Sequence, residues 1–284
     1  MAEEVLAQLA DPAPPPLVMG VLNVTPDSFS DGGRYTDLDA ALAHARLMLD
    51  EGASILDIGG ESTRPGSDAV PDEAQIARVV PVIETLRRVL GRAFAISVDT
   101  RSPRVADVAL AAGADSVNDV SGAREPGMLD CVARHRAALV LMHMQGTPAT
   151  MQLDPRYDDV TREVSDYLLA RAEAAIVAGV PRERIVLDPG IGFGKTRAHN
   201  LTLLRDLPAF VALGYPVLLG TSRKRFMGAI CRETVPQELV GATCATTALG
   251  VMAGVRAFRV HDVKPNRQAL EVAWALRAET GEAG

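Results

Sequence analysis

Short apolar runs alternate with longer amphipathic or Ala-rich stretches from about residue 17 to the end of the chain. The runs are aliphatic and nearly continuous, which is typical of parallel strands covered on both faces. The predicted strands are 17–22, 54–58, 94–98, 115–118, 138–142, 185–187, 216–219 and 257–260. The stretches between them predict helices near 38–51, 72–90, 103–112, 126–136, 159–179, 199–206, 236–254 and 265–278.

Eight strand–helix units in a chain of 284 residues predict a single-domain α/β protein, a (β/α)8 or TIM barrel. A doubly wound sheet is the alternative, but no GxGxxG sequence follows an early strand. We expect residues 1–16 to be a flexible N-terminal tail. Residues 17–278 then form the barrel, and 279–284 form a C-terminal tail.

Composition narrows the functional classes. A net charge of −7 argues against a nucleic-acid partner, which would require a basic face. The uncharged stretch 239–255 contains Gly, Thr and Ala throughout, so it predicts a buried helix and no membrane partner. The cysteines Cys131, Cys231 and Cys244 are widely spaced, and the N-terminus is acidic and then Pro-rich. Both features favour a reducing, cytoplasmic location.

Polar or sulfur-containing side chains follow every predicted strand, at the end where a (β/α)8 barrel carries its active site. In strand order they are Asn23; Asp57 and Glu61; Asp99; Asn118 and Asp119; Met142 and His143; Asp188; Ser222, Arg223 and Lys224; and Arg259, His261 and Asp262. A single aspartate at a strand end often caps the next helix, and this interpretation stays open for Asp119 and Asp262. Because all eight predicted strands end in polar or sulfur-containing side chains, we predict a functional site at this end of the barrel.

Two chemically distinct sets emerge among these residues. Lys224, Arg259 and His261, with Arg64 after the second strand, are suited to a phosphate group, which barrels frequently bind after strands 7 and 8. The set Asp99, Asn118 and Asp188 is suited to a heterocycle with adjacent N–H donors, such as an aminopyrimidinone. The pattern therefore predicts a heterocycle pocket beside an anion pocket. A hydrogen-bonded core histidine remains the alternative for His261, and a solvated surface position for Arg223 and Arg225.

The sequence does not indicate a nucleophile or an all-protein metal site. No cysteine ends a strand, Ser222 has no obvious base, and no His/Cys cluster has metal-ligand spacing. Asn23 and nearby loop oxygens could hold Mg²⁺ only together with substrate phosphates.

Eight sequence motifs resemble those of the dihydropteroate synthases of the folate pathway. They are NVTPDSFSDGG (23–33), GGESTRPG (59–66), SVDT (97–100), NDVSG (118–122), LMHMQGTPATMQ (141–152), LDPGIGFGK (187–195), GTSRK (220–224) and RVHDVK (259–264). They occur in order between about residues 17 and 275. The resemblance implies a TIM-barrel transferase and sulfonamide target. It would condense 6-hydroxymethyl-7,8-dihydropterin pyrophosphate with 4-aminobenzoate, giving 7,8-dihydropteroate and pyrophosphate.

The resemblance also implies residue roles. The pterin site comprises Asp99, Asn118, Met142, Asp188, Gly220 and Lys224. The pyrophosphate site comprises Asn23, Arg64, Arg259 and His261, with a Mg²⁺ cofactor linked to Asn23. The 4-aminobenzoate site comprises Thr63, Arg64, Pro65, Phe193, Lys224 and Ser222. The residues expected to carry catalysis are Asp99, Arg64, Lys224, Arg259 and His261. No role is assigned to Thr25, Asp27, Ser28 or Ser30.

The family mechanism implied is SN1-like, because the methylene carbon on the dihydropterin can carry positive charge while pyrophosphate leaves. The loops 24–35 and 61–71 would then close over the intermediate. The resemblance further implies a homodimer, for which the uncharged helix over 236–255 offers an apolar face. Two alternatives are a pterin-dependent methyltransferase barrel and a non-catalytic pterin-binding barrel. The first should lack the NVTPDSFSDGG loop at 23–33 and the STRPG loop at 62–66, and the second should show substitutions at Arg64, Asp99, Lys224 or His261.

Overall fold

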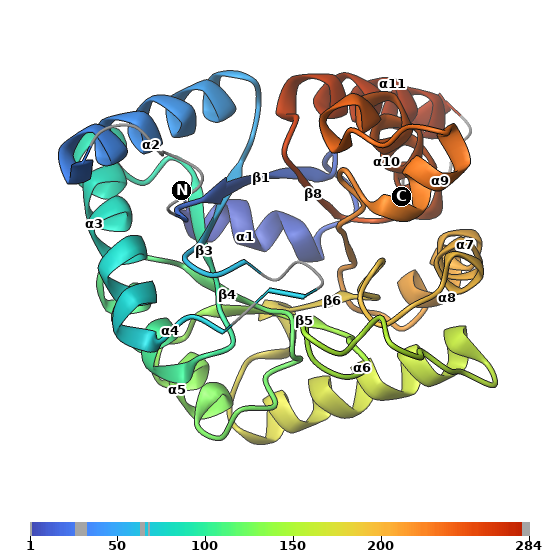
Figure 1. Cartoon of the computed structure of the whole chain (residues 1–284), viewed down its shortest axis with the longest axis horizontal. Coiled ribbons are helices and arrows are strands. Elements are labelled where there is room, and N and C mark those ends of the chain that lie inside the picture. The colour runs from blue at the N-terminus through green and yellow to red at the C-terminus, as the bar shows by residue number, and fades with distance from the viewer. Residues whose placement is uncertain (1, 26–32, 63–65, 68, 280–284) are drawn as a thin grey trace.

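The chain folds into a ring of eight parallel strands in this computed structural model, which describes residues 2–25, 33–62, 66–67 and 69–279. The strands are β1 Leu17–Asn23, β2 Ile55–Gly59, β3 Ala95–Asp99, β4 Ser116–Asp119, β5 Ala138–Met142, β6 Ile185–Asp188, β7 Leu218–Leu219 and β8 Ala257–Val260. They pair in the order β6-β5-β4-β3-β2-β1-β8-β7, and a parallel bridge between Leu187 and Val217 closes the ring (Figure 1). The predicted (β/α)8 barrel is confirmed.

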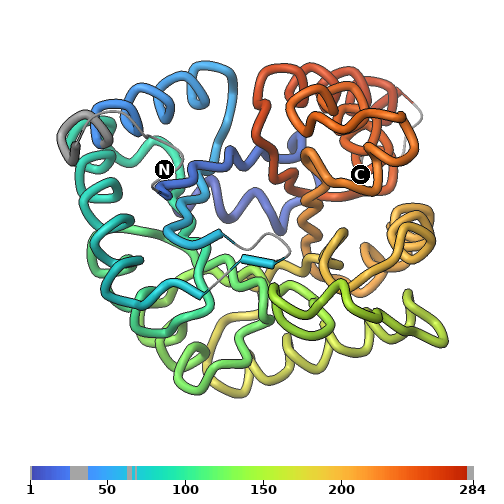
Figure 2. The backbone as a smooth tube through the Cα atoms, viewed as in Figure 1, coloured from blue at the N-terminus to red at the C-terminus, as the bar shows by residue number. Residues whose placement is uncertain are grey.

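Helices surround the strands in chain order, as the backbone path in Figure 2 shows. They are α2 Gly33–Asp50, α3 Asp72–Leu90, α4 Pro103–Ala111, α5 Met128–His135, α6 Val160–Val177, α7 Arg197–Arg205, α8 Leu207–Val211, α9 Arg225–Cys231, α10 Val240–Ala253 and α11 Val263–Glu279. Two 3₁₀ turns, η2 Arg182–Arg184 and η3 Pro236–Leu239, complete the described elements. The predicted helix 236–254 is therefore η3 followed by α10, and the short helices α8 and α9 were not predicted. Within the described ranges, no helix is both long and apolar enough to cross a membrane.

The N-terminal segment differs from the expected flexible tail. Ala2–Ala10 form a helix, α1, which lies across the end of the barrel where the strands begin (Figure 1). Leu9 is buried there against the first residues of several strands, including Leu17. Arg256 fixes the last turn of α1 and the segment after it by donating hydrogen bonds of 2.9 Å to the carbonyl oxygens of Gln8 and Pro14. A helix of this length is marginal alone, so tertiary packing stabilises it.

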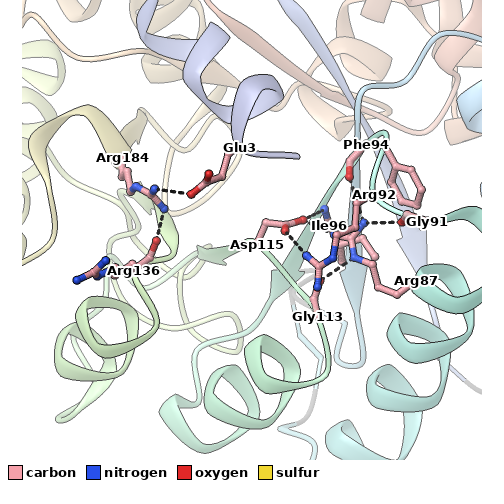
Figure 3. Close-up of polar contacts among 10 residues, drawn as sticks. All are labelled: Glu3, Arg87, Gly91, Arg92, Phe94, Ile96, Gly113, Asp115, Arg136 and Arg184. Carbon is pink, nitrogen blue, oxygen red and sulfur yellow. Dashed lines mark hydrogen bonds and ion pairs between the residues drawn. The ribbon is translucent and has the colours of Figure 1, made fainter. Parts of the chain in front are cut away.

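A network of arginines ties the loops at this same end of the barrel (Figure 3). Arg87 of α3 pairs with Asp115, and Arg87 Nε also donates a 2.8 Å hydrogen bond to the carbonyl oxygen of Gly113. Asp115 Oδ2 accepts a 2.8 Å bond from the backbone N–H of Ile96 at β3. A cavity of about 560 Å³ lies beside this network, lined by residues of α1 and of the loops that precede β3, β4 and β5. These contacts join the loops at the end of the barrel opposite to the one where (β/α)8 enzymes carry their active sites.

The apolar core explains why most charged groups of the strands lie near their carboxyl ends. Strand side chains such as Leu22, Ile58, Ile96 and Leu139 are fully buried in one apolar cluster with the inner faces of the helices. Helices on the outside and side chains in the barrel interior exclude water from the strands on both faces. Buried charged side chains therefore need a partner, as Arg87 and Asp115 have at the amino end, or a place near the carboxyl ends where a ligand can reach them.

Candidate active site

Arg259 of β8 joins two buried carboxylates across the barrel mouth. Its Nε lies 2.6 Å from Asp57 Oδ2, and its Nη2 lies 2.7 Å from Asp99 Oδ2. The side chain of Asp57 is 0% exposed and that of Asp99 is 5% exposed. Burial lowers the pKa of Arg259, but the two carboxylates raise it by more, so the guanidinium stays charged. Arg259 therefore connects the ends of β8, β2 and β3.

One carboxylate oxygen of Asp99 can accept a hydrogen bond from a ligand. Its Oδ1 is buried and has no hydrogen-bond partner among the described residues. Burial raises the pKa of Asp99 to about 7, although Arg259 opposes this change. The neighbouring Asn118 does not reach Asp99; its Nδ2 donates a 3.0 Å hydrogen bond to Asp57 Oδ2. An unpartnered buried carboxylate oxygen is costly, and an N–H donor from a heterocycle would offset that cost.

Asp188 ends β6 and lies opposite this pair in the mouth. Its Oδ1 accepts a 2.7 Å hydrogen bond from the N–H of Gly190, and burial raises its pKa to about 6. A side chain on Gly220 would lie 3.8 Å from Asp188 Oδ2 and 3.9 Å from Arg259 Cβ. Gly220 thus keeps open the space between the acidic group and the arginine. Burial, followed by the charge of Arg259, lowers the pKa of Lys224 to about 8.

The glycine-rich loop after β6 places an aromatic ring beside Lys224. Lys224 Nζ lies 4.0 Å from the centre of the Phe193 ring, within the range of a cation–π contact. Phe193 also packs against a small apolar cluster that includes Met142 of β5. Gly190 has a φ of 68°, and a Cβ there would lie 2.0 Å from the carbonyl oxygen of His143. Only glycine allows this loop to approach β5 so closely.

Ser222 and His261 form a pair that the sequence did not indicate. The Oγ of Ser222 lies 2.9 Å from His261 Nδ1 and accepts a 3.1 Å bond from the backbone N–H of His261. No base for Ser222 was obvious from the sequence, and the structure places His261 beside it because the ends of the neighbouring strands β7 and β8 converge. Arg223, for which a solvated surface position was considered, instead pairs with Asp262 through bonds of 3.0 and 2.6 Å.

Asn23 ends β1 at the level of Asp99. It is in register with Gly59 of β2, which is in register with Asp99 of β3. A Cβ on Gly59 would lie 3.5 Å from Asn23 Oδ1 and 3.6 Å from Asp99 Cβ, so the amide oxygen of Asn23 and the side chain of Asp99 both lie close to Gly59. An amide oxygen is a ligand of the type that Mg²⁺ accepts, and one such ligand leaves the remaining positions to phosphate and water. The residues present fit a cation that arrives with its phosphate.

Three predicted site residues, Thr63, Arg64 and Pro65, lie outside the described residues. Asp27, Ser28 and Ser30, to which no role was assigned, also lie outside them. The segment beside them is anchored by Glu61, whose Oε1 accepts a 2.9 Å bond from the N–H of Val70. Glu61 Oε2 also accepts a 2.9 Å bond from Arg101.

Sequence reasoning missed two further contributors. Asp57 was recognised at a strand end but not assigned to the site, although a carboxylate in an otherwise apolar strand could have indicated it. Lys195 was not singled out, yet it lies buried with its Nζ 2.9 Å from His143 Nδ1. Each interaction joins segments far apart in the chain, so spacing alone does not predict it.

One group of potential metal ligands lies away from the barrel mouth. Asp107 of α4 and Cys131 and His135 of α5 offer ligand atoms within 4.8 Å of one another, a grouping that sequence spacing did not indicate. Arg134 also contacts Asp107, at 3.3 Å, and burial raises the pKa of the Cys131 thiol to about 11. A nearby cation and a protonated thiol both oppose metal binding at this position.

Comparison with known proteins agrees with this geometry. The family model described as pterin binding enzyme matches residues 19–261. Dihydropteroate synthase of Synechocystis sp. is 46% identical, covering 95% of this chain and 98% of the relative. The structure of Xanthomonas albilineans dihydropteroate synthase with 4-aminobenzoic acid is 48% identical, covers 95% of this chain and 94% of that chain, and has a TM-score of 0.87. Yersinia pestis dihydropteroate synthase in a sulfonamide drug complex is 42% identical, with coverage of 93% and 95% and a TM-score of 0.87.

The barrel and its mouth therefore define a pterin-binding enzyme, and the chain belongs to that family. Its near full-length relatives place it among the dihydropteroate synthases, which are transferases of folate biosynthesis.

Proposed function

We propose that the barrel mouth condenses 6-hydroxymethyl-7,8-dihydropterin pyrophosphate with 4-aminobenzoate to give 7,8-dihydropteroate and pyrophosphate. The observation that carries this proposal is the buried Asp99, with one oxygen held by Arg259 and the other without a partner among the described residues. A carboxylate so placed is suited to the N–H edge of a pterin. Dihydropteroate synthase from Xanthomonas albilineans is 45% identical to this chain, with a TM-score of 0.83, and its structure is a complex with 7,8-dihydropteroate.

The pterin would lie between Asp99 and Asp188, with Asn118, Met142 and Gly220 completing its pocket. Both carboxylates are buried, and both have pKa values raised by that burial. Their negative charge would stabilise positive charge on the pterin as pyrophosphate leaves, which is the electrostatic requirement of an SN1-like step. Water exclusion by the barrel walls strengthens this interaction.

Pyrophosphate would leave toward the cationic side formed by Arg259 and His261, with Arg64 supplied by a loop outside the described residues. Arg259 remains charged because Asp57 and Asp99 raise its pKa, so it presents a fixed positive charge to the departing anion. Asn23 would hold Mg²⁺ together with the phosphate oxygens. When bound, Mg²⁺ supplies charge neutralisation of the leaving group.

The arylamine would bind beside Phe193 and Lys224, on the outer side of the pterin. The Phe193 ring provides an apolar face, and Lys224 Nζ at 4.0 Å from it can meet the carboxylate of 4-aminobenzoate. Ser222 lies next to His261 and so connects this pocket to the pyrophosphate side. The amine then attacks the methylene carbon, and its proton passes to water or to the departing anion.

An assay of product formation tests the proposed reaction. The protein, the pterin pyrophosphate, Mg²⁺ and 4-aminobenzoate should yield equal amounts of dihydropteroate and pyrophosphate by mass spectrometry. The SN1-like order predicts a slow release of pyrophosphate when 4-aminobenzoate is omitted. No dihydropteroate with all components present would contradict the proposal. Methyl transfer to a corrinoid acceptor would support the methyltransferase alternative, and pterin binding without turnover would support a non-catalytic barrel.

We also propose a cytoplasmic homodimer. The exposed positions of α10 are Gly241, Ala245, Leu249 and Met252, which form one uncharged stripe at helical spacing. Leu249 is 62% exposed and Met252 is 41% exposed. Light scattering should give twice the chain mass, and Leu249→Glu should give a monomer; a monomeric parent protein would contradict this proposal.

A further inference from the structure

Lys195 is a buried amine at the base of the glycine-rich loop, and no role has been assigned to it. It ends the sequence GIGFGK after β6 and is only 2% exposed. The chain has 26 arginines but three lysines, Lys195, Lys224 and Lys264. Lys195 is buried and Lys224 half-buried beside the site, whereas Lys264 is exposed on α11. Two of the three lysines therefore lie at or beside the site.

Three acceptors surround the amine of Lys195. Its Nζ lies 2.9 Å from His143 Nδ1, 2.9 Å from the carbonyl oxygen of Phe193 and 3.3 Å from the carbonyl oxygen of His143. A lysine ammonium has three N–H donors, so each donor has one partner. Burial lowers the pKa of His143 to about 2, so its ring is neutral and Nδ1 can accept.

The cost of this arrangement argues against a purely structural role. Among the described residues, no carboxylate forms an ion pair with Lys195. Burial lowers its pKa to about 7, although the charge of Asp188 opposes this change. A methionine would fill the same volume without desolvating an ammonium, and such apolar replacements are often neutral or stabilising.

The acceptors belong to the two segments that frame the substrate site. His143 follows β5 and donates a 3.1 Å backbone hydrogen bond to the carbonyl oxygen of Asp188. Phe193 carries the ring that meets Lys224. The His143 ring is in turn fixed by an edge-on contact with Tyr167, at 4.9 Å between ring centres. Lys195 thus connects a rigid strand end to the loop that presents the aromatic ring.

We propose that Lys195 is a positioning residue for the arylamine: it holds the backbone of Phe193 against His143, so that the Phe193 ring stays beneath Lys224. This inference rests on the proposed function and adds a residue that acts through Phe193 without touching substrate. Loss of the amine removes the hydrogen bond that ties the Phe193 carbonyl to His143 through Lys195, whereas the flanking Gly192 and Gly194 keep their own hydrogen bonds. The arylamine pocket then loses its ordered wall, while Asp99 on the far side of the mouth is unaffected.

Steady-state kinetics of Lys195→Met with both substrates test the proposal, with Lys264→Met as the matched control. The KM for 4-aminobenzoate should rise roughly 10-fold or more in K195M, equivalent to the loss of about one hydrogen bond. The KM for the pterin pyrophosphate should change by less than about 3-fold, because Lys195 does not hold the residues proposed to bind the pterin. Equal rises in both KM values, or no rise in either, would overturn the inference.

A second pair of variants covers the case in which K195M does not fold. His143→Leu removes the Nδ1 acceptor, whereas His143→Asn places an amide oxygen near the same position. H143L should show the selective rise in the KM for 4-aminobenzoate, and H143N should reverse most of it. Equal behaviour of the two variants would overturn the inference. If the parent protein makes no dihydropteroate, the proposed function itself fails, and that result is separate from these comparisons.

Because the chain has only three lysines, the side-chain amine of Lys195 can be observed directly by NMR spectroscopy. Protein labelled with ¹⁵N-lysine should give one slowly exchanging amine signal from Lys195, which disappears in K195M. The same signal should weaken in H143L. A Lys195 signal with the exchange rate of the exposed Lys264 would overturn the proposed contacts.

Discussion

Arg259 at the end of β8 reaches Asp99 at the end of β3, with 2.7 Å between Nη2 and Oδ2. Two other strands, β2 and β1, lie between them in the sheet. The contact therefore spans the barrel mouth and places a fixed cation beside the carboxylate proposed to bind the pterin. Asp99→Asn tests this relationship directly.

Asp99→Asn should weaken binding of the pterin pyrophosphate by roughly 10- to 100-fold, because a charge-assisted hydrogen bond is replaced by a neutral one. The amide fills the same volume, so the fold should be retained. Isothermal calorimetry gives the affinity, and circular dichroism with thermal melting checks the fold. An unchanged affinity would show that the pterin does not contact Asp99.

The pH dependence of kcat/KM for the pterin pyrophosphate should be bell-shaped. Burial raises the pKa of Asp99 to about 7 and that of Asp188 to about 6, so both bind protons as the pH falls and lose the charge that stabilises the cationic pterin. Burial lowers the pKa of Lys224 to about 8, so activity falls again as the pH rises through that value. In Asp99→Asn, the fall in kcat/KM at low pH should be smaller, because Asp99 no longer titrates. A flat profile between about pH 6 and pH 9 would contradict these assignments.

Asn23→Ala should raise the Mg²⁺ concentration needed for half-maximal activity, because one protein oxygen ligand is lost. Since substrate phosphates supply the other ligands, high Mg²⁺ should restore most of the rate. Activity measured across a Mg²⁺ series, after treatment with a chelator, shows the shift. Full activity in excess chelator would show that no divalent cation is needed.

Arg87→Ala should destabilise the protein by about 3 kcal/mol, the lower end of the cost of breaking a buried ion pair, because Asp115 keeps a 3.6 Å contact with the exposed Arg92. Arg87 and Asp115 lie at the end of the barrel opposite the site, with side chains 9% and 13% exposed. Urea unfolding measures the loss, and KM values measured below the transition should stay near those of the parent. Arg104→Ala is the control, since its partner Glu73 is on the surface, where ion pairs contribute little.

The sequence predicted the barrel because each strand is an unbroken aliphatic run between helices, and it located the site because those runs stop at polar residues such as Asn23 and Asp188. It did not predict α1, since Ala2–Ala10 gain their stability from contact with the barrel floor and not from local propensity. The pairs formed by Ser222 with His261 and by Lys195 with His143 depend on how strand ends converge. No local pattern encodes that convergence, so only the folded structure shows these contacts.

A crystal structure with bound 7,8-dihydropteroate tests the central claim most directly. The account predicts the pterin ring between the carboxylates of Asp99 and Asp188, with the aminobenzoate part against Phe193 and Lys224. Product bound elsewhere, or bound with its pterin ring away from Asp99 and Asp188, would contradict it.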